Sequence, residues 1–173
     1  NKEFLDKYLS EYIYYKQSLE CLSTKDIATI FRKAAILLTS KYKDEMLAYT
    51  IIGQGKSVYE ADVDAIRELA DFLNFNAEYA HHIVNKQPYS PYGVVNKSKY
   101  NPLNGFVAAI TPFNFTAIGG NLASAPTLFK NSVIWKPSDN AILSNYLFYE
   151  IMLEAGLPKE AITFAPCNPK LFT

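Results

Sequence analysis

Hydrophobic positions recur at helical spacing along the first part of the chain. The hydroxyl groups of Ser23 and Thr24 can cap the start of a helix. The apolar residues after them return every three or four positions, at Ile27, Ile30, Phe31, Ala34, Leu37 and Leu38. This spacing predicts a helix with one buried face.

Two more helices are expected before residue 87. The first runs from about residue 44 to residue 50, where Gly53 and Gly55 end it. The second covers residues 57–80 and carries the longest apolar stripe, formed by Val63, Ile66, Ala70, Leu73, Ala77 and Ala80. A stripe of this kind is typical of core packing. Residues 1–86 are therefore interpreted as a helical leading segment.

The pattern changes after Lys86. Prolines and polar residues dominate residues 87–104, around a short β-like stretch at 92–95, and predict a two-stranded excursion from the helical body. Residues 105–173 then alternate a buried strand (GFVAAIT), a helix at 117–130, a strand (SVIWK), a helix at 141–155 and a strand (AITFAP). This order is the signature of a parallel sheet with crossover helices, so the fold class is α/β.

Composition and charge exclude several classes of protein. The 173 residues include 17 Lys+Arg and 17 Asp+Glu, and this balance argues against a chain that coats nucleic acid or an anionic membrane. No apolar run is long enough to span a bilayer. Cys21 and Cys167 have no partnering spacing, which favours a reducing compartment over a disulfide framework. Because the chain lacks an initial Met and ends after a strand with no returning helix, we expect it to be a fragment.

Three short patterns are weak candidates for chemistry. Gly55-Lys56-Ser57 mimics the end of a phosphate-binding loop, but Thr50 stands where that motif needs glycine, and the motif should follow a strand. A helix-breaking turn is the favoured interpretation. His81 and His82 are adjacent and have no third ligand at helical spacing, so no metal site is expected. Neither cysteine has a recognisably electropositive setting, as a nucleophile requires.

The residues at the ends of the first two strands are more specific candidates for a functional site than these three patterns. Asn114 follows a buried strand and precedes a helix, the place where α/β sheets bind ligands, and its amide can donate to a developing oxyanion. A turn asparagine that satisfies local backbone explains the same spacing. The next strand ends in Lys136, Ser138 and Asp139, which suit the hydroxyls and phosphates of a nucleotide. A solvated turn is the alternative there.

The text from Gly105 to Phe164 closely resembles the aldehyde dehydrogenase superfamily. Its strand-end motif is Pro-aromatic-Asn-Phe, here PFNF from Pro112, followed later by a Lys-Pro-Ser turn, here at Lys136. Most of the superfamily has proline where this chain has Thr116. That feature, with GQGK at 53–56 and ELADFLNFNA at 68–77, resembles the branch that oxidises L-glutamate γ-semialdehyde, the open form of Δ1-pyrroline-5-carboxylate. The resemblance extends from about residue 23 to the last residue.

The resemblance implies the start of a Rossmann-like NAD-binding domain and a set of site residues. Asn114 would stabilise the oxyanion of the thiohemiacetal formed from the aldehyde. Thr111 and Lys136 would contact NAD, the lysine at the adenosine ribose, with Ser138 and Asp139 close by in the same turn. The family's nucleophilic cysteine and general-base glutamate lie beyond this stretch, and neither cysteine of this chain takes the nucleophile's place.

The resemblance also implies how substrate and partner subunits bind. Phe115 would pack on the aliphatic substrate, and Glu68 would attract its α-amino group. The sequence itself supports Glu68, because Phe72 and Phe75 follow at i+4 and i+7 on the same helical face, although an exposed acid on a long helix remains the alternative. Residues 87–104 match the family's oligomerisation hairpin, which implies a homodimer or a larger homo-oligomer.

Two other functions remain open at this stage. The chain could serve a dehydrogenase for another semialdehyde, or it could be a truncated, non-catalytic module that acts through its hairpin. An open reading frame that continues past Thr173 into a cysteine-bearing segment would favour the enzyme, and a stop codon there would favour the module. The usual cellular location of the family implies that the protein lies in the mitochondrial matrix in a eukaryote and in the cytoplasm otherwise.

Overall fold

The computed structural model describes residues 3, 6, 19 and 21–168. Most of the predicted helical segment before residue 21, and the last five residues, lie outside these described residues. The leading part of the chain is helical, as the sequence predicted, and consists of α2 (Thr24–Thr39), α3 (Lys43–Gln54), α4 (Val58–Ala61), the π-helix η1 (Asp62–Glu68) and α5 (Leu69–Asn85).

The second half alternates strands and helices, which confirms the α/β class. The elements are β1 (Phe106–Ile110), α6 (Thr116–Ser124), the short 3-10 helix η2 (Ala125–Phe129), β2 (Ser132–Lys136), η3 (Asp139–Ala141), α7 (Ile142–Ala155), η4 (Lys159–Ala161) and β3 (Ile162–Phe164). The strands form one parallel sheet in the order β1-β2-β3. Ala108 lies opposite Ile134, and Ile134 lies opposite Thr163.

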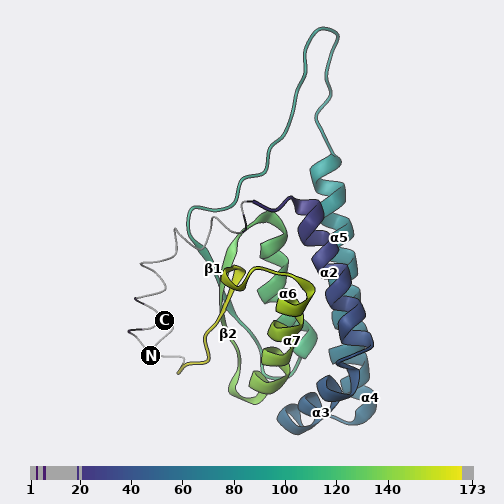
Figure 1. The fold of residues 1–173 in the computed structure, drawn as a ribbon, viewed down its shortest axis with the longest axis vertical. Coiled ribbons are helices and arrows are strands. Elements are labelled where there is room, and N and C mark those ends of the chain that lie inside the picture. The colour runs from purple at the N-terminus through teal and green to yellow at the C-terminus, as the bar shows by residue number, and fades with distance from the viewer. Residues whose placement is uncertain (1–2, 4–5, 7–18, 20, 169–173) are drawn as a thin grey trace.

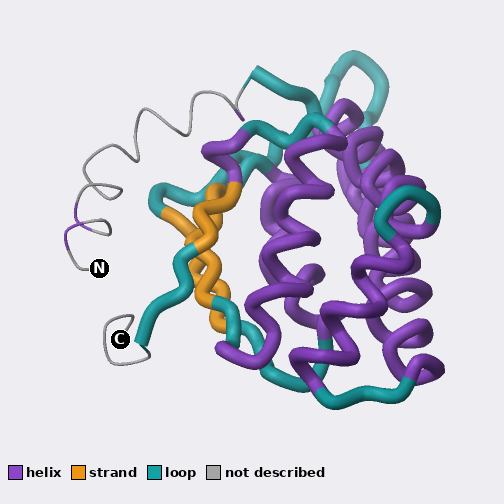
Figure 2. Tube along the Cα trace, turned by 60° about the horizontal axis from the view of Figure 1, so that its bottom comes forward, coloured by secondary structure: helices purple, strands orange, loops and turns teal. Residues whose placement is uncertain are grey.

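The described helices lie on one face of the sheet (Figure 2). Helix α6 contacts β2, and α7 contacts β3. Helices α2 and α5 run antiparallel to each other and pack outside α6 and α7 (Figure 1). Sequence analysis predicted a buried first strand, and this prediction is wrong for β1. Alternate residues on the face opposite the helices, Phe106, Ala108 and Ile110, are exposed because β1 is an edge strand with helices on one side only.

The core forms where the apolar faces of the helices meet the sheet. Trp135 of β2 is fully buried, and its ring meets Phe148 of α7 and Phe164 of β3 edge to face. Helix α2 begins at the predicted cap: the Ser23 hydroxyl accepts a bond from Asp26 N, and the Asp26 carboxylate accepts one from Ser23 N, at 3.1 and 2.9 Å. Within the described residues, no helix is long and apolar enough to cross a membrane.

The predicted helix over 57–80 is continuous but changes its turn size. In η1 the N–H of Leu69 donates to the carbonyl of Asp64, five residues earlier. This wider turn shifts the buried face relative to an α-helix. Val63 is therefore 40% exposed, contrary to the predicted stripe, whereas Asp64 is buried. The other five stripe residues are buried as predicted.

Helix α3 is longer than predicted. Gly53 lies inside the helix, and only Gly55 ends it, with a left-handed φ of 67° that suits glycine. Gly53 serves packing instead: a Cβ there would lie 2.4 Å from the carbonyl oxygen of Asn140, in the turn between β2 and α7. The glycine lets α3 approach the backbone of that turn.

We expect Gly53→Ala to destabilise the protein by about 2 kcal/mol, because the backbone of the 139–141 turn must shift. Gly119→Ala is the matched control, since its Cβ would meet only the side-chain end of Asn145, at 2.7 Å, and alanine favours the helix. Urea denaturation of both variants measures the difference in free energy of unfolding. A Gly53→Ala protein as stable as the wild type would show that the 139–141 turn shifts without a cost in free energy.

Residues 87–104 form the predicted excursion, which projects from the body as a narrow loop (Figure 1), but no strand forms in it. The stretch at 92–95 is a turn, with Gly93 at φ 80° and a bond from Val94 N to Pro91 O. Side-chain amides link the two arms instead: Asn96 Nδ2 donates to Tyr89 O, and Gln87 Oε1 accepts from Ser98 N. An isolated two-stranded ribbon is at best marginally stable, and prolines cannot donate to a ladder.

Candidate functional site

The three parallel strands end at the same edge of the sheet, and the predicted site residues follow them there. The backbone continues the sheet for one more residue, with Thr111 N donating to Lys136 O at 3.2 Å and Ala165 N to Trp135 O at 2.8 Å. The chain from β1 then enters α6 through Asn114 and Phe115, and the chain from β2 passes through Pro137 to η3. This is the edge at which α/β sheets bind their ligands.

Thr111 is held rigidly at this edge. Its side chain is buried, and its hydroxyl oxygen accepts a hydrogen bond from the indole N–H of Trp135 at 2.9 Å. The hydroxyl hydrogen has no acceptor among the described residues. Ser138 is half-buried and Asp139 is exposed at the start of η3, where Ser138 O accepts from Ala141 N.

Lys136 is 6% exposed, which is uncommon for lysine. Its ammonium group donates to Pro137 O at 2.9 Å and forms no ion pair with any described residue. Since an ammonium group has three N–H donors, two of them remain without an acceptor among the described residues. The buried amine therefore suits a ligand that brings hydroxyl or phosphate oxygens.

Asn114 is exposed, and its side chain makes no hydrogen bond within the described residues. A turn asparagine would bond to nearby backbone, so this geometry differs from the alternative considered for Asn114. Phe115 is 38% exposed and serves as the N-cap residue of α6. The Lys56 ammonium nitrogen lies 4.4 Å from the centre of its ring.

Glu68 ends η1 and is half-buried. Phe72 packs against the core, but Phe75 is exposed and stacks on Tyr79 with ring centres 6.3 Å apart. The common aromatic face predicted for Glu68 is therefore only partly formed. Glu68 does share η1 with Asp64, whose carboxylate contacts the start of α6.

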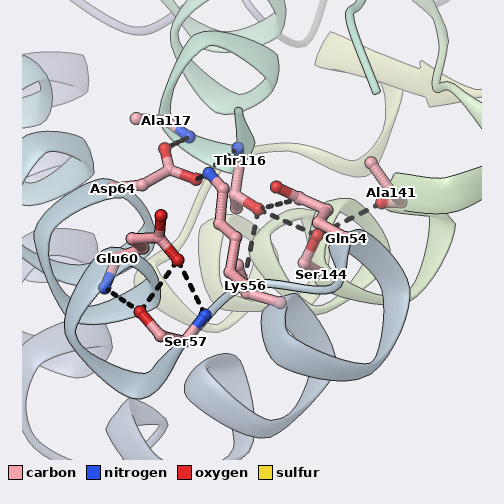
Figure 3. A network of polar contacts seen from close by, with 10 residues as sticks. Gln54, Lys56, Ser57, Glu60, Asp64, Thr116, Ala117, Ala141 and Ser144 are labelled. Atoms are coloured by element: carbon pink, nitrogen blue, oxygen red, sulfur yellow. Dashed lines mark hydrogen bonds and ion pairs between the residues drawn. The ribbon is translucent and has the colours of Figure 1, made fainter. Parts of the chain in front are cut away.

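A polar network that the sequence did not predict lies at the first turn of α6, which begins two residues after Asn114 (Figure 3). Asp64 accepts bonds from the backbone N–H groups of Thr116 and Ala117, and Lys56 pairs with it at 2.6 Å. The Thr116 hydroxyl also contacts side chains of Gln54 and Ser144. The sequence carries no local signal for it, because at α-helical spacing Asp64 lies off the predicted apolar stripe and only the wider turn of η1 buries it.

The weak motifs have structural roles in the described residues. Ser57 caps α4 through a capping box with Glu60, and the bonds from the Ser57 backbone and side chain lower the pKa of that carboxyl group. His81 contacts Asn85, and His82 lies 3.4 Å from Glu78. The described residues contain no group of three or more side chains suited to a metal ion. Cys21 is exposed, whereas Cys167 is half-buried and follows β3 at the same sheet edge as Asn114.

The aldehyde dehydrogenase family model matches residues 14–170. The chain belongs to the aldehyde dehydrogenase family. The resemblance predicted from the strand-end motifs is thus confirmed, and so is the fold it implied.

Relatives within this family agree on one enzyme. The chain is 47% identical over 172 residues to human mitochondrial delta-1-pyrroline-5-carboxylate dehydrogenase, covering 99% of this chain and 31% of the relative. It is 51% identical over 152 residues to a probable delta-1-pyrroline-5-carboxylate dehydrogenase of Schizosaccharomyces pombe, covering 87% of this chain and 28% of the relative. The chain therefore spans about a third of the length of these family members.

The fold agrees with a solved structure of the same kind of enzyme. The crystal structure of the Mycobacterium tuberculosis delta-pyrroline-5-carboxylate dehydrogenase bound with NAD superposes with a TM-score of 0.91 at 41% identity. The match covers 95% of this chain and 31% of that aldehyde dehydrogenase.

Proposed function

We propose that this chain contributes the leading part of the NAD-binding domain to an enzyme that oxidises L-glutamate γ-semialdehyde to L-glutamate in proline catabolism. Relatives with 47% and 51% identity that carry this enzyme's name support the proposal. The single structural observation that carries it is the exposed side chain of Asn114 at the carboxyl edge of the sheet, which has no hydrogen-bond partner among the described residues.

Asn114 would stabilise the negative oxygen that forms when a thiolate adds to the aldehyde. Its amide N–H₂ is a donor that needs no rearrangement, because no described residue occupies it. Preorganised donors of this kind account for a large share of enzymatic rate enhancement.

The same edge fits NAD. Lys136 offers two donors from a buried ammonium group that no described residue accepts, and Thr111 offers a hydroxyl at the end of the neighbouring strand. Lys136 would bind the adenosine ribose, and Ser138 and Asp139 would lie close to it in the turn before α7. NAD, when bound, accepts the hydride that the aldehyde carbon loses on oxidation. The chain's own residues bind and orient this cofactor.

Glu68 and Phe115 would select the substrate. Phe115 is partly exposed and can cover an aliphatic chain, and the half-buried carboxylate of Glu68 can attract an ammonium group. The two residues come from segments that Asp64 ties together. Together they would bind a short semialdehyde that carries an amine.

We expect Glu68→Gln, in the full-length enzyme, to raise the Michaelis constant for glutamate semialdehyde about tenfold, because a charge-assisted contact worth on the order of 1.4 kcal/mol is lost. The constant for a simple aldehyde without an amine should barely change. Steady-state kinetics with both substrates measures the difference. Equal effects on both substrates would assign Glu68 to the fold.

Residues 87–104 would mediate assembly into a homodimer or a larger homo-oligomer. Their exposed apolar side chains project from the body and have little core of their own, as at Tyr89, Tyr92, Val94 and Val95. Surfaces of this kind are typical of interfaces. In a eukaryotic cell the enzyme would be mitochondrial, as the human and Emericella nidulans relatives are named.

The proposed function is tested by assaying the full-length enzyme that contains this chain. NADH formation with glutamate semialdehyde should greatly exceed that with other semialdehydes of similar length. A preference for another semialdehyde would favour the alternative dehydrogenase. A reading frame that stops at Thr173 would favour the non-catalytic module instead.

A further inference from the structure

Helix α6 begins on a cap that comes from a distant part of the chain. Its own N-cap residue, Phe115, has no side-chain acceptor. The Asp64 carboxylate takes that role: Oδ2 accepts from Thr116 N at 3.0 Å, and Oδ1 accepts from Ala117 N at 2.9 Å (Figure 3). Asp64 is 2% exposed and lies in η1, 52 residues earlier. A distant segment thus fixes the first turn of α6.

The buried carboxylate depends on Lys56. The ammonium nitrogen lies 2.6 Å from Asp64 Oδ2, and the two side chains are only 15% and 3% exposed. A charge removed from water is costly unless it is paired and hydrogen-bonded. Lys56 also lies over the ring of Phe115. The pair therefore contacts the two residues that follow Asn114, because Lys56 meets Phe115 and Asp64 accepts from Thr116 N.

Thr116 adds a second attachment. Its hydroxyl oxygen accepts from Gln54 Nε2 at 2.6 Å and lies 3.0 Å from Ser144 Oγ, which connects α3, α6 and α7. Proline at this position would supply neither the N–H that Asp64 accepts nor the hydroxyl. Thr116 therefore meets Gln54 and Lys56, two residues of the GQGK sequence at 53–56, at one point in the fold.

We propose that the Lys56–Asp64 pair is a positioning element that sets where the Asn114 amide lies. This inference relies on the proposed function in one respect, the role of Asn114 as the oxyanion donor. Neither residue of the pair needs to touch substrate. The pair holds Phe115 and the first amides of α6 from the helical layer, and Asn114 is the next residue before that fixed point. Small displacements of a catalytic group are known to cost large factors in rate.

The test uses Asp64→Asn in the full-length enzyme, with Arg67→Gln as the control. Arg67 forms an ion pair with Asp62 in the same π-helix, but the arginine side chain is 71% exposed, and neither side chain hydrogen-bonds to α6 within the described residues. We expect Asp64→Asn to lower kcat about tenfold or more, with a smaller rise in KM through Phe115. Arg67→Gln should keep wild-type kcat. Lys56→Met should lower kcat as Asp64→Asn does, and Lys56→Arg, which keeps the charge, should have a kcat close to that of the wild type. If Asp64→Asn does not fold, these two Lys56 variants test the proposal.

The decisive comparison repeats Asp64→Asn in an Asn114→Ala background. If Asp64 acts through Asn114, the second substitution should add little further loss, because effects on one shared element are not additive. The same loss of kcat in both backgrounds would overturn the proposal.

Hydrogen exchange of the peptide at the start of α6 separates this proposal from the proposed function. We expect faster exchange at the Thr116 and Ala117 amides in Asp64→Asn, and unchanged exchange there would overturn the positioning role. If the wild-type enzyme does not oxidise glutamate semialdehyde, the proposed function fails, and the comparison in the two backgrounds is made with the aldehyde that the enzyme does oxidise.

Discussion

Replacing Asn114 with alanine in the full-length enzyme is expected to lower turnover of glutamate semialdehyde about a hundredfold. Removing one oxyanion donor typically costs on the order of 3 kcal/mol in the barrier. The effect should be large because the amide is exposed at the sheet edge and has no described partner, so the interaction forms only with the reacting carbonyl. NADH formation at saturating substrate measures kcat directly.

The expected loss should fall on kcat rather than on KM, because the donor meets an oxygen that is negative only near the transition state. Asn74→Ala is a suitable control, since Asn74 is exposed on α5 and outside the site. Its kinetics should match those of the wild type. Unchanged turnover in Asn114→Ala would remove the oxyanion role and return Asn114 to the status of a turn residue.

Much of this fold could be predicted from local sequence. The strand SVIWK spans the residues of β2, and the cap at Ser23 begins α2, because hydrophobic period and capping residues are local signals. Gly156 ends α7 in a left-handed conformation, as a C-terminal glycine often does. These features depend on neighbours in sequence and not on the tertiary fold.

The errors arise where distant parts of the chain decide the outcome. An apolar strand predicts burial on both faces, but β1 has described helices on one face only, and Phe106 and Ile110 are exposed. Gly53 resembled a helix stop, whereas its use is close packing against Asn140. In residues 87–104 the β-like stretch at 92–95 suggested two strands, but side-chain amides link the two arms in place of a strand ladder.

The residues of the candidate site divide in the same way, into those that local sequence indicates and those that only tertiary contacts bring together. The motif around Asn114 and the Lys136 turn could be found from sequence, because both follow strand ends directly. Lys56 was interpreted as part of a turn, since its partner Asp64 and the amides of α6 become neighbours only in the folded chain. Helical periodicity did not indicate this contact either, because Asp64 lies off the predicted apolar stripe and becomes buried only through the wider turn of η1.

The 173 residues alone are expected to show no aldehyde oxidation. Covalent catalysis requires a thiolate beside the oxyanion donor. Cys21 precedes α2 and is exposed, and Cys167 follows β3. Although Cys167 shares the sheet edge with the β1 end, β2 lies between the two strands, which places them roughly 10 Å apart. Neither thiol is therefore placed to attack a carbonyl that Asn114 contacts.

Cofactor binding by these residues alone should also be weak. A dinucleotide crosses several strand ends, and the described sheet supplies three, with helices on one face. The exposed apolar residues of β1 should favour self-association, because an open sheet edge and face can pair with another chain. Calorimetric titration with NAD and sedimentation measure these two properties.

The activity assay follows NADH formation by the purified 173 residues with glutamate semialdehyde, and Cys21→Ser and Cys167→Ser are the matched variants. Without a positioned thiolate, all three proteins should give the rate of the protein-free control. Turnover that disappears in Cys167→Ser would show that the strand spacing understates how closely the chain after β3 approaches Asn114. The oxyanion donor and the nucleophile would then both lie within this chain, at one edge of a three-stranded sheet.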